Sequence, residues 1–319
     1  MKITNRFGLP ETILNAVKDD EYSKGDSLLS VTQLISPPRI VLLQDLNADN
    51  LTVDVVDRVP ALLGTAVHKI IEKGSKDLPN HIVEERLFAE INGWKISGAV
   101  DLQIDNGDGT WQINDYKCTS VYSVMTEKAE WIQQLNCYAF LATLAHGRKV
   151  TSLKIIAILR DWQRKSAEMK PDYPQSQVVS VDIPLWTLEE QGSFVHDRVK
   201  LHQQAKKLVD NGEAPPYCTN QERWLRDETW ALMKEGRKSA IKLYDNEEEA
   251  KRCAAELGRT SGSTHRVEHR AGNPVRCAGN YCMVANWCRQ YQEELGNLPS
   301  QGAGGMPERS DEQDEPSLP

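Results

Sequence analysis

The sequence predicts an α/β protein in which helices flank a central mixed β-sheet, followed by a small cysteine-rich α+β subdomain. Three observations support this prediction: helical apolar spacing in 61–73, turn-linked strand patterns in 82–117, and three closely spaced cysteines in 277–288. The chain has 319 residues, of which 39% are hydrophobic and 26% are charged. This is the composition of a globular protein with a sizeable core.

The first sixty residues lead into the predicted core. An apolar stretch from Leu28 to Ile35 ends at two prolines, Pro37 and Pro38, which prevent a helix from continuing. We interpret 1–60 as a region that packs on the core. In 61–73 apolar residues recur three and four positions apart, which predicts an amphipathic helix.

Three strands joined by two turns are predicted next. Ile82–Glu90 is followed by Asn92-Gly93, a dipeptide favoured in two-residue hairpin turns. From Trp94 to Ile104 apolar residues then alternate, with a glycine at 98 in the same alternation. A second turn at 106–109 leads to a third strand, Thr110–Lys117.

Helices and strands continue to the end of the predicted core, 61–212. Thr187 and Glu190 have the spacing of a capping box, which predicts a helix beginning there. The expected elements are a helix at Glu127–His146 ended by Gly147, strands at Ser152–Asp161 and Gln177–Ile183, and the capped helix up to Asp210.

The composition changes at 212–216, Gly-Glu-Ala-Pro-Pro, which we interpret as a domain boundary. Residues 213–296 are expected to form the small α+β subdomain, and the acidic, apolar-poor tail 297–319 is expected to be disordered. The elements expected in this subdomain are a strand at Ala240–Tyr244, a helix at Glu247–Leu257 ended by Gly258, and a strand at His265–His269.

The sequence contains no apolar run near the ~20 residues that a membrane helix needs, and its start lacks a signal-peptide pattern. We therefore expect a cytoplasmic protein with no membrane partner, in which the seven cysteines are thiols or metal ligands rather than disulfides. The net charge of −8 does not favour nucleic acid. The tail carries five acidic residues and one arginine, so the rest of the chain can hold a local basic patch.

Two aspartates and a lysine are candidate catalytic residues. Asp115 and Lys117 lie two apart on the third strand, so their side chains project to the same face. Asp101 lies on the preceding strand, and a hairpin can bring its carboxylate beside that of Asp115. Two such carboxylates repel each other unless a divalent cation binds, and oxygen ligands suit Mg²⁺ or Mn²⁺. Alone, Asp-x-Lys more often marks a surface ion pair.

Flanking helices add His68, one position beside the apolar stripe of 61–73, and the pair Gln134 and Tyr138, four apart on one helix face. The order His, Asp, Asp-x-Lys, Gln-x-x-x-Tyr, on helix, strand, strand and helix, resembles the RecB-type branch of the PD-(D/E)XK nucleases. That branch includes CRISPR-adaptation and viral exonucleases. The resemblance by motif covers 61–145.

The resemblance implies a restriction-endonuclease-like fold and cleavage of DNA by metal-activated water, with exonuclease activity and a helicase or recombination partner as further expectations. It implies that His68, Asp101, Asp115 and the Tyr116 carbonyl bind the metal. Lys117 would act in catalysis, and Gln134 and Tyr138 would position Lys117 or the DNA backbone. The DNA substrate could be single-stranded. The alternative is a non-catalytic DNA-binding or recruitment subunit on a nuclease-derived fold.

Four cysteines form a second candidate site: Cys218, Cys277, Cys282 and Cys288. Four thiolates suit an iron–sulfur cluster or a structural Zn²⁺. Relatives in the same branch carry a [4Fe–4S] cluster, although their lone cysteine usually precedes the core and their first gap is shorter. We expect [4Fe–4S], with Zn²⁺ as the alternative. Cys118, Cys137 and Cys253 are expected to be ordinary buried thiols.

Basic residues gather around the cysteine segment, with interleaved aromatic residues such as Trp224 and Trp230 that can stack on bases. A solvated charged face explains this pattern equally well. The predicted DNA-binding residues are Arg223, Arg226, Arg237, Lys238 and Arg276.

Overall fold

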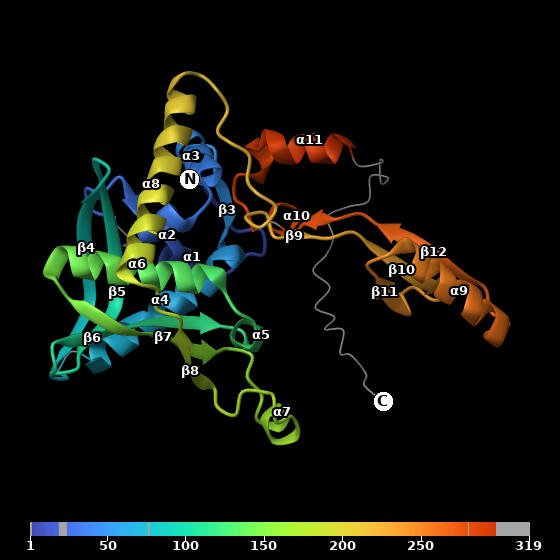
Figure 1. Cartoon of the computed structure of the whole chain (residues 1–319), viewed down its shortest axis with the longest axis horizontal. Helices are drawn as coiled ribbons and strands as arrows, with labels where there is room; N and C mark the ends of the chain where they lie inside the picture. The colour runs from blue at the N-terminus through green and yellow to red at the C-terminus, as the bar shows by residue number, and fades with distance from the viewer. Residues whose placement is uncertain (1, 19–23, 76, 280, 298–319) are drawn as a thin grey trace.

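The structure is a computed structural model that describes residues 2–18, 24–75, 77–279 and 281–297. Its centre is a six-stranded sheet (Figure 1). Five strands follow the order β2-β5-β6-β7-β8, and the sixth, β4, pairs with β5 along nearly its whole length. The strands are β2 (Leu29–Ser30), β4 (His81–Ile91), β5 (Trp94–Asp105), β6 (Thr110–Thr119), β7 (Lys149–Leu159) and β8 (Val178–Ile183). Both parallel and antiparallel pairs occur, so the predicted mixed sheet is confirmed.

The predicted hairpin joins β4 to β5. Ile91 pairs with Trp94, and the two turn residues between them, Asn92 and Gly93, have φ of 51° and 75°. Positive φ at both positions is what a two-residue hairpin turn requires, and Asn-Gly adopts it readily. The turn therefore sets the register of β4 against β5 over their whole length.

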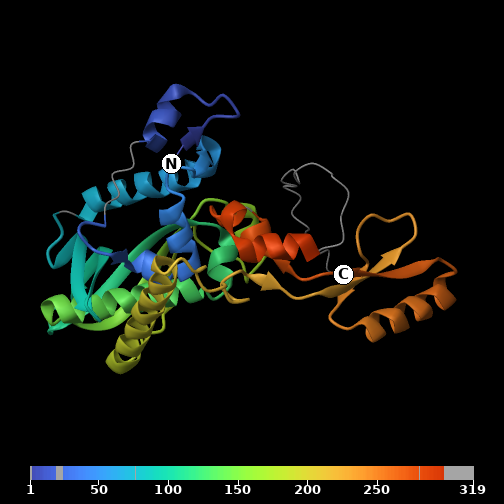
Figure 2. The same cartoon turned by 90° about the horizontal axis from the view of Figure 1, so that it is seen from above.

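Helices cover both faces of this sheet (Figure 2). α4 (Val55–Ser75) lies on one face, while α6 (Ala129–His146) and α8 (Leu188–Asp210) lie on the other. α6 is apolar nearly all round, and nine of its residues are buried. Gly147 ends α6 with a φ of 66°, and α8 opens with the predicted capping box. The prediction of flanking helices is confirmed.

Close packing between β5 and α6 depends on Gly98. A Cβ at this position would lie 2.9 Å from ring carbons of Tyr138 and 3.1 Å from Cδ1 of Leu141. Because the ring sits in a packed core, Gly98→Ala is expected to lower the free energy of unfolding by about 1–3 kcal/mol. Urea unfolding measures this change.

The matched control is Gly64→Ala on α4, where an added Cβ would meet nothing within 4 Å. Alanine favours a helix over glycine by about 1 kcal/mol, so this control should gain stability. Equal unfolding midpoints for the two variants would contradict the close approach of α6 to β5.

The N-terminal region contributes several short elements. Pro38 takes the first position of α3, directly after α2, as expected for a proline that cannot continue a helix. α4 begins six residues before the predicted Ala61, because the Asp54 carboxylate accepts a hydrogen bond from Val56 N at 3.2 Å and caps the helix. The remaining elements are β1 (Lys2–Thr4), α1 (Glu11–Lys18), α2 (Val31–Ile35), α3 (Pro38–Leu46) and β3 (Thr52–Asp54).

The C-terminal region contains a second, three-stranded sheet in the order β11-β10-β12. Together with α9 it projects from the body of the molecule beyond β9 and β13 (Figures 1 and 2). The elements are β9 (Leu225–Arg226), β10 (Thr229–Lys234), β11 (Lys242–Tyr244), α9 (Glu247–Ser261), β12 (His265–Arg270), β13 (Asn273–Pro274), α10 (Val275–Ala278), η1 (Ala285–Trp287) and α11 (Arg289–Asn297); α5 (Val121–Met125) and α7 (Arg164–Met169) belong to the core region.

The end of α9 differs from the prediction. The helix continues past Gly258 and ends at Gly262, which has a φ of 65° and so takes the left-handed conformation of a helix C-cap. Of the predicted acidic tail, only Asn297 lies within the described residues. No helix in the described part of the chain is both long and apolar enough to span a membrane.

Candidate active site

The candidate site lies where β5 and β6 separate. The two strands pair up to Leu102 and Asn114, and the next residues in that register are Asp101 and Asp115. Beyond that point, Tyr116 N donates a hydrogen bond to Asp101 Oδ2 at 2.8 Å. The two aspartates therefore lie side by side on neighbouring antiparallel strands, as their spacing predicts.

His68 extends from α4 toward the same place. Its Nδ1 lies 3.5 Å from Asp101 Oδ2 and 3.7 Å from Glu84 Oε1. Its Nε2 lies 2.9 Å from the carbonyl oxygen of Tyr116, which can only accept a hydrogen bond. One ligand atom from each of His68, Glu84 and Asp101 lies within 4.8 Å of the others. Three elements thus bring a nitrogen and two carboxylate oxygens into one potential metal site.

Asp115 connects this group to Lys117 and to α6. Its Oδ2 lies 2.6 Å from Lys117 Nζ, and its Oδ1 accepts a hydrogen bond from Gln134 Nε2 at 3.2 Å. Gln134 Nε2 also lies 2.8 Å from the Tyr138 hydroxyl oxygen. Asp115 is only 1% exposed, and it is not part of the compact group of three around His68. Its oxygens instead point to the lysine and the glutamine.

The electrostatics of the site favour a bound cation. Burial, followed by repulsion from Asp115, raises the pKa of Asp101 to about 7. The Glu84 carboxylate beside His68 raises the pKa of that imidazole above its usual value. A divalent cation would offset the repulsion between the carboxylates, and hard oxygen ligands suit Mg²⁺ or Mn²⁺.

Glu84 is a residue to which the sequence analysis gave no role. The hairpin register places it opposite Asp101, between the pairs Val83 with Leu102 and Glu85 with Val100, and it has a φ of 51°. A positive φ at a non-glycine strand residue is strained, and such strain concentrates at functional sites. Counting back from the Asn92-Gly93 turn would have placed Glu84 across from Asp101, although the distortion itself has no sequence signal.

The family assignment agrees with this geometry. The model of the PD-(D/E)XK nuclease superfamily matches residues 79–289, which is more than half of the chain. The chain belongs to the PD-(D/E)XK nuclease superfamily. The matched span contains β4, β5, β6 and α6, and therefore Asp101, Asp115 and Lys117 with their partners on α6.

Solved structures similar to this superfamily member include the crystal structure of SSO0001, with 19% identity, a TM-score of 0.43, and coverage of 59% of this chain and 84% of that one. Another is an alkaline exonuclease from Laribacter hongkongensis, with 13% identity, a TM-score of 0.32, and coverage of 57% and 91%. Its complex with dAMP matches at 11% identity and a TM-score of 0.34, covering 58% and 92%. No curated protein matches the sequence.

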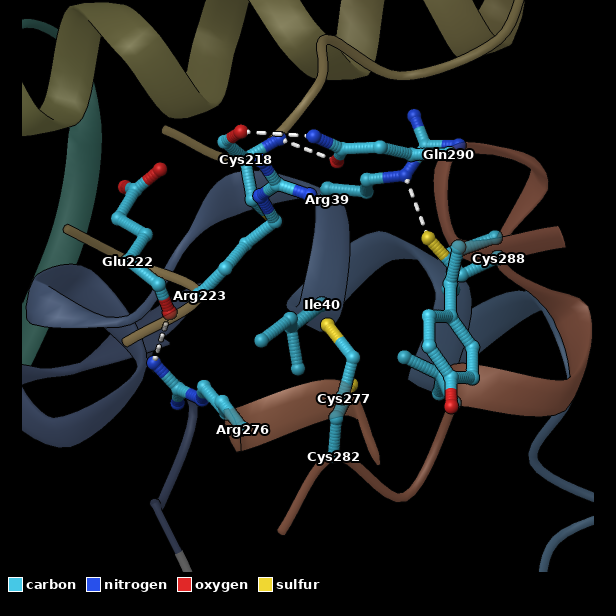
Figure 3. Close-up of a pocket in the computed structure, with 13 residues that line it drawn as sticks. Arg39, Ile40, Cys218, Glu222, Arg223, Arg276, Cys277, Cys282, Cys288 and Gln290 are labelled. Carbon is cyan, nitrogen blue, oxygen red and sulfur yellow. Dashed lines mark hydrogen bonds between the residues drawn. The ribbon is translucent and has the colours of Figure 1, made fainter. Parts of the chain in front are cut away.

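A second candidate site lies between the superfamily core and the C-terminal region. The four predicted cysteines, Cys218, Cys277, Cys282 and Cys288, line one pocket together with residues of α3 such as Ile40 (Figure 3). Cys218 follows α8, Cys277 lies on α10, and the other two flank η1. The pocket therefore joins segments that are far apart in the sequence.

The cysteines that were predicted to be ordinary thiols do not line the pocket. Cys253 packs in a separate apolar cluster with Leu232 and Tyr244, and Cys137 is buried in the main core. Within the pocket, burial raises the pKa of Cys218 to about 12 and that of Cys277 to about 11, with neighbouring sulfurs adding to both shifts. Thiolates in this pocket would need a cation to offset their charge.

The predicted DNA-binding residues fall into two places. Arg223 and Arg276 line the cysteine pocket, with Arg223 bonded to Glu294 and Asn220. Arg237 and Lys238 are exposed in the loop after β10, at the end of the small sheet where Lys234 pairs with His265. Arg226 is exposed on β9, between these two places.

Proposed function

We propose that this chain is a metal-dependent DNA nuclease that hydrolyses phosphodiester bonds. The compact group of His68, Glu84 and Asp101 would hold Mg²⁺ or Mn²⁺, and Asp115 and the carbonyl of Tyr116, which lie beside it, would complete the set of ligands. The observation that supports this most strongly is the convergence of a histidine from α4 with carboxylates from β4 and β5, beside Asp115 and Lys117 of β6. Surface ion pairs do not explain an Asp115 that is 1% exposed.

The donor set fits a divalent cation, because three carboxylates, those of Glu84, Asp101 and Asp115, gather around one lysine and one histidine. When bound, the cation would polarise a phosphate oxygen and lower the pKa of a water molecule. Lys117, 27% exposed, would place its ammonium beside the phosphate and stabilise charge that develops there. Gln134 would hold the Asp115 carboxylate in place, and Tyr138 would hold Gln134.

We further propose that the activity is exonucleolytic. The test uses end-labelled linear DNA, single- and double-stranded, and a covalently closed circle of the same sequence, each with Mg²⁺ or Mn²⁺ and with chelator. Digestion of linear DNA alone supports an exonuclease, whereas opening of the circle indicates an endonuclease. Metal-independent binding without digestion would favour the alternative, a non-catalytic DNA-binding subunit. A helicase or recombination partner stays a prediction.

DNA binding is expected to depend on the exposed basic residues beyond β10. Phosphate contacts dominate nucleic-acid affinity, so Arg237→Ala with Lys238→Ala should weaken binding on all sequences alike. The plot of log K against log salt should become flatter by about one unit for each phosphate that the variant no longer neutralises. Binding to a labelled oligonucleotide across a salt series measures both effects.

The control for this double variant is Lys200→Ala with Lys206→Ala on α8, where each lysine already pairs with an aspartate on its own helix. These changes should leave affinity and salt slope unchanged. Unchanged binding in the Arg237/Lys238 variant would show that the loop after β10 is only a solvated face.

We propose that the four cysteines of the pocket bind one metal centre, with [4Fe–4S] preferred over Zn²⁺. Four cysteines from segments far apart in the sequence line this one pocket, which supports a shared centre. The preference for [4Fe–4S] rests on the resemblance to relatives that carry such a cluster. Iron, sulfide and zinc contents of anaerobically purified protein distinguish the two centres.

A further inference from the structure

Arg39 is a buried cation beside the cysteine pocket. Its side chain belongs to α3 and is 2% exposed. Nε donates a hydrogen bond to Cys288 Sγ at 3.1 Å (Figure 3). The other contacts of the guanidinium are with the carbonyls of Pro215 and Pro216 and with the ring of Tyr217. Among the described residues, no carboxylate forms an ion pair with it. A buried guanidinium without an anion is strongly unfavourable.

Two further arginines of the same pocket have unpaired buried donors. The Nε atoms of Arg223 and Arg276 are buried and, among the described residues, have no hydrogen-bond partner. A buried donor without a hydrogen-bond partner is unfavourable. The carboxylate of Glu222, which also lines the pocket, lies 3.6 Å from Arg198. Arg223 pairs with Glu294, so the positive charge that no carboxylate of the described residues neutralises is that of Arg39 and Arg276, together with the two buried Nε donors.

We propose that Arg39, Arg223 and Arg276 form an arginine group that stabilises the cysteine-bound centre as a buried anion, with Arg39 as its main member. The inference rests on the proposed metal centre. Four thiolates around a centre that carries two positive charges leave a net negative charge of two. The loaded pocket therefore holds an anion. That anion pairs with Arg39, and its sulfurs accept the hydrogen bonds that the Nε atoms of Arg223 and Arg276 otherwise lack.

The arginine group is a set of positioning residues, because it acts on the centre through the cysteine sulfurs. Partners of this kind typically change metal affinity by about 10–100-fold. Arg39→Met keeps the apolar stem but removes the charge and the bond to Cys288. It should therefore release metal to a chelator about tenfold faster than the wild type. In an iron–sulfur centre, the same change should also make the reduction potential more negative, because the cation favours the more negatively charged reduced state.

The matched control is Arg148→Met. Arg148 directly precedes β7 and is 11% exposed, and it contacts Glu85, Gln103 and the ring of Trp111 on the main sheet. This change removes a buried ion pair and should lower the thermal midpoint, but it should leave metal release at the wild-type rate. Arg276→Gln is a milder second variant at a half-buried position, and should show faster release than the wild type even where Arg39→Met folds poorly.

The experiment is the release of metal from loaded full-length protein, followed with a chromogenic chelator, with thermal midpoints measured in parallel. Faster release in the Arg39 and Arg276 variants but not in the Arg148 variant supports the proposal. If the protein binds metal but all variants release it at the same rate, the proposed role of the arginines is wrong, while the metal centre stands. Wild-type protein without stoichiometric metal would reject the centre itself, and the arginine group with it, while leaving the nuclease site untouched.

Discussion

Asp115→Asn is expected to abolish DNA cleavage while the protein stays folded. The substitution keeps the size of the side chain but removes the charge that faces Lys117 at 2.6 Å and lies beside Asp101. If Asp115 is a ligand of the proposed metal, loss of its charge should reduce the cleavage rate roughly a thousandfold, or about 4 kcal/mol of activation free energy. Single-turnover digestion of end-labelled DNA in Mg²⁺ measures the rate.

The Asp115→Asn variant should lose activity without losing stability. In metal-free protein, the Asp115 charge repels Asp101 and helps to raise its pKa to about 7. Removing that charge relieves the repulsion, and Lys117 is exposed enough to reach solvent. The free energy of unfolding in chelator is therefore expected to stay close to the wild-type value or to rise. A catalytic residue that is unfavourable for folding is a common trade-off at active sites.

Two comparisons make this prediction specific. Lys117→Ala should lose cleavage to a similar degree, because the same site loses its positive charge. Asp182→Asn, at an exposed carboxylate of β8 paired with Lys154, should cleave at the wild-type rate. Wild-type digestion by either the Asp115 or the Lys117 variant would show that the site has been assigned wrongly.

Much of the candidate active site was predictable from local patterns. The Asn92-Gly93 turn and the alternation along β5 indicate a hairpin, and the Asp-x-Lys spacing puts Asp115 and Lys117 on one face of β6. His68 was predictable from its place on an amphipathic helix together with the motif order. These features depend on residues near one another in the chain, where turn chemistry and strand or helix period act directly.

Other features depend on contacts that no local pattern encodes. Arg39 bonds to Cys288, 249 residues away, and its position after two prolines indicates only the start of a helix. The backbone of Glu84, with a φ of 51°, lies where β4 pairs with β5 and where His68 approaches from α4. Tertiary packing decides both. The early start of α4 is different, because the cap that Asp54 provides to Val56 N is a local signal that the sequence analysis did not use.

The second large effect is expected for Cys288→Ala. Cys288 is 7% exposed and packs with Ile40 and Leu43 of α3 in the apolar cluster beneath the pocket. If the pocket binds a metal centre, losing one of four ligands should release the metal and weaken the attachment of the C-terminal segments to α3. Because structural metal centres contribute directly to folding, the free energy of unfolding should fall by more than about 4 kcal/mol.

Cys253→Ala is the matched control, because Cys253 packs in the small cluster near Tyr244, away from the pocket. It should keep the wild-type metal content and lose only about 1 kcal/mol from a smaller buried side chain. Metal content and urea unfolding of the two variants, measured on the same preparations, separate the roles of the two cysteines. Similar losses of stability in both, together with a metal-free wild type, would show that the four cysteines are ordinary packed thiols. A large loss confined to Cys288→Ala, with loss of metal, would instead show that the centre holds α3, α10 and α11 together.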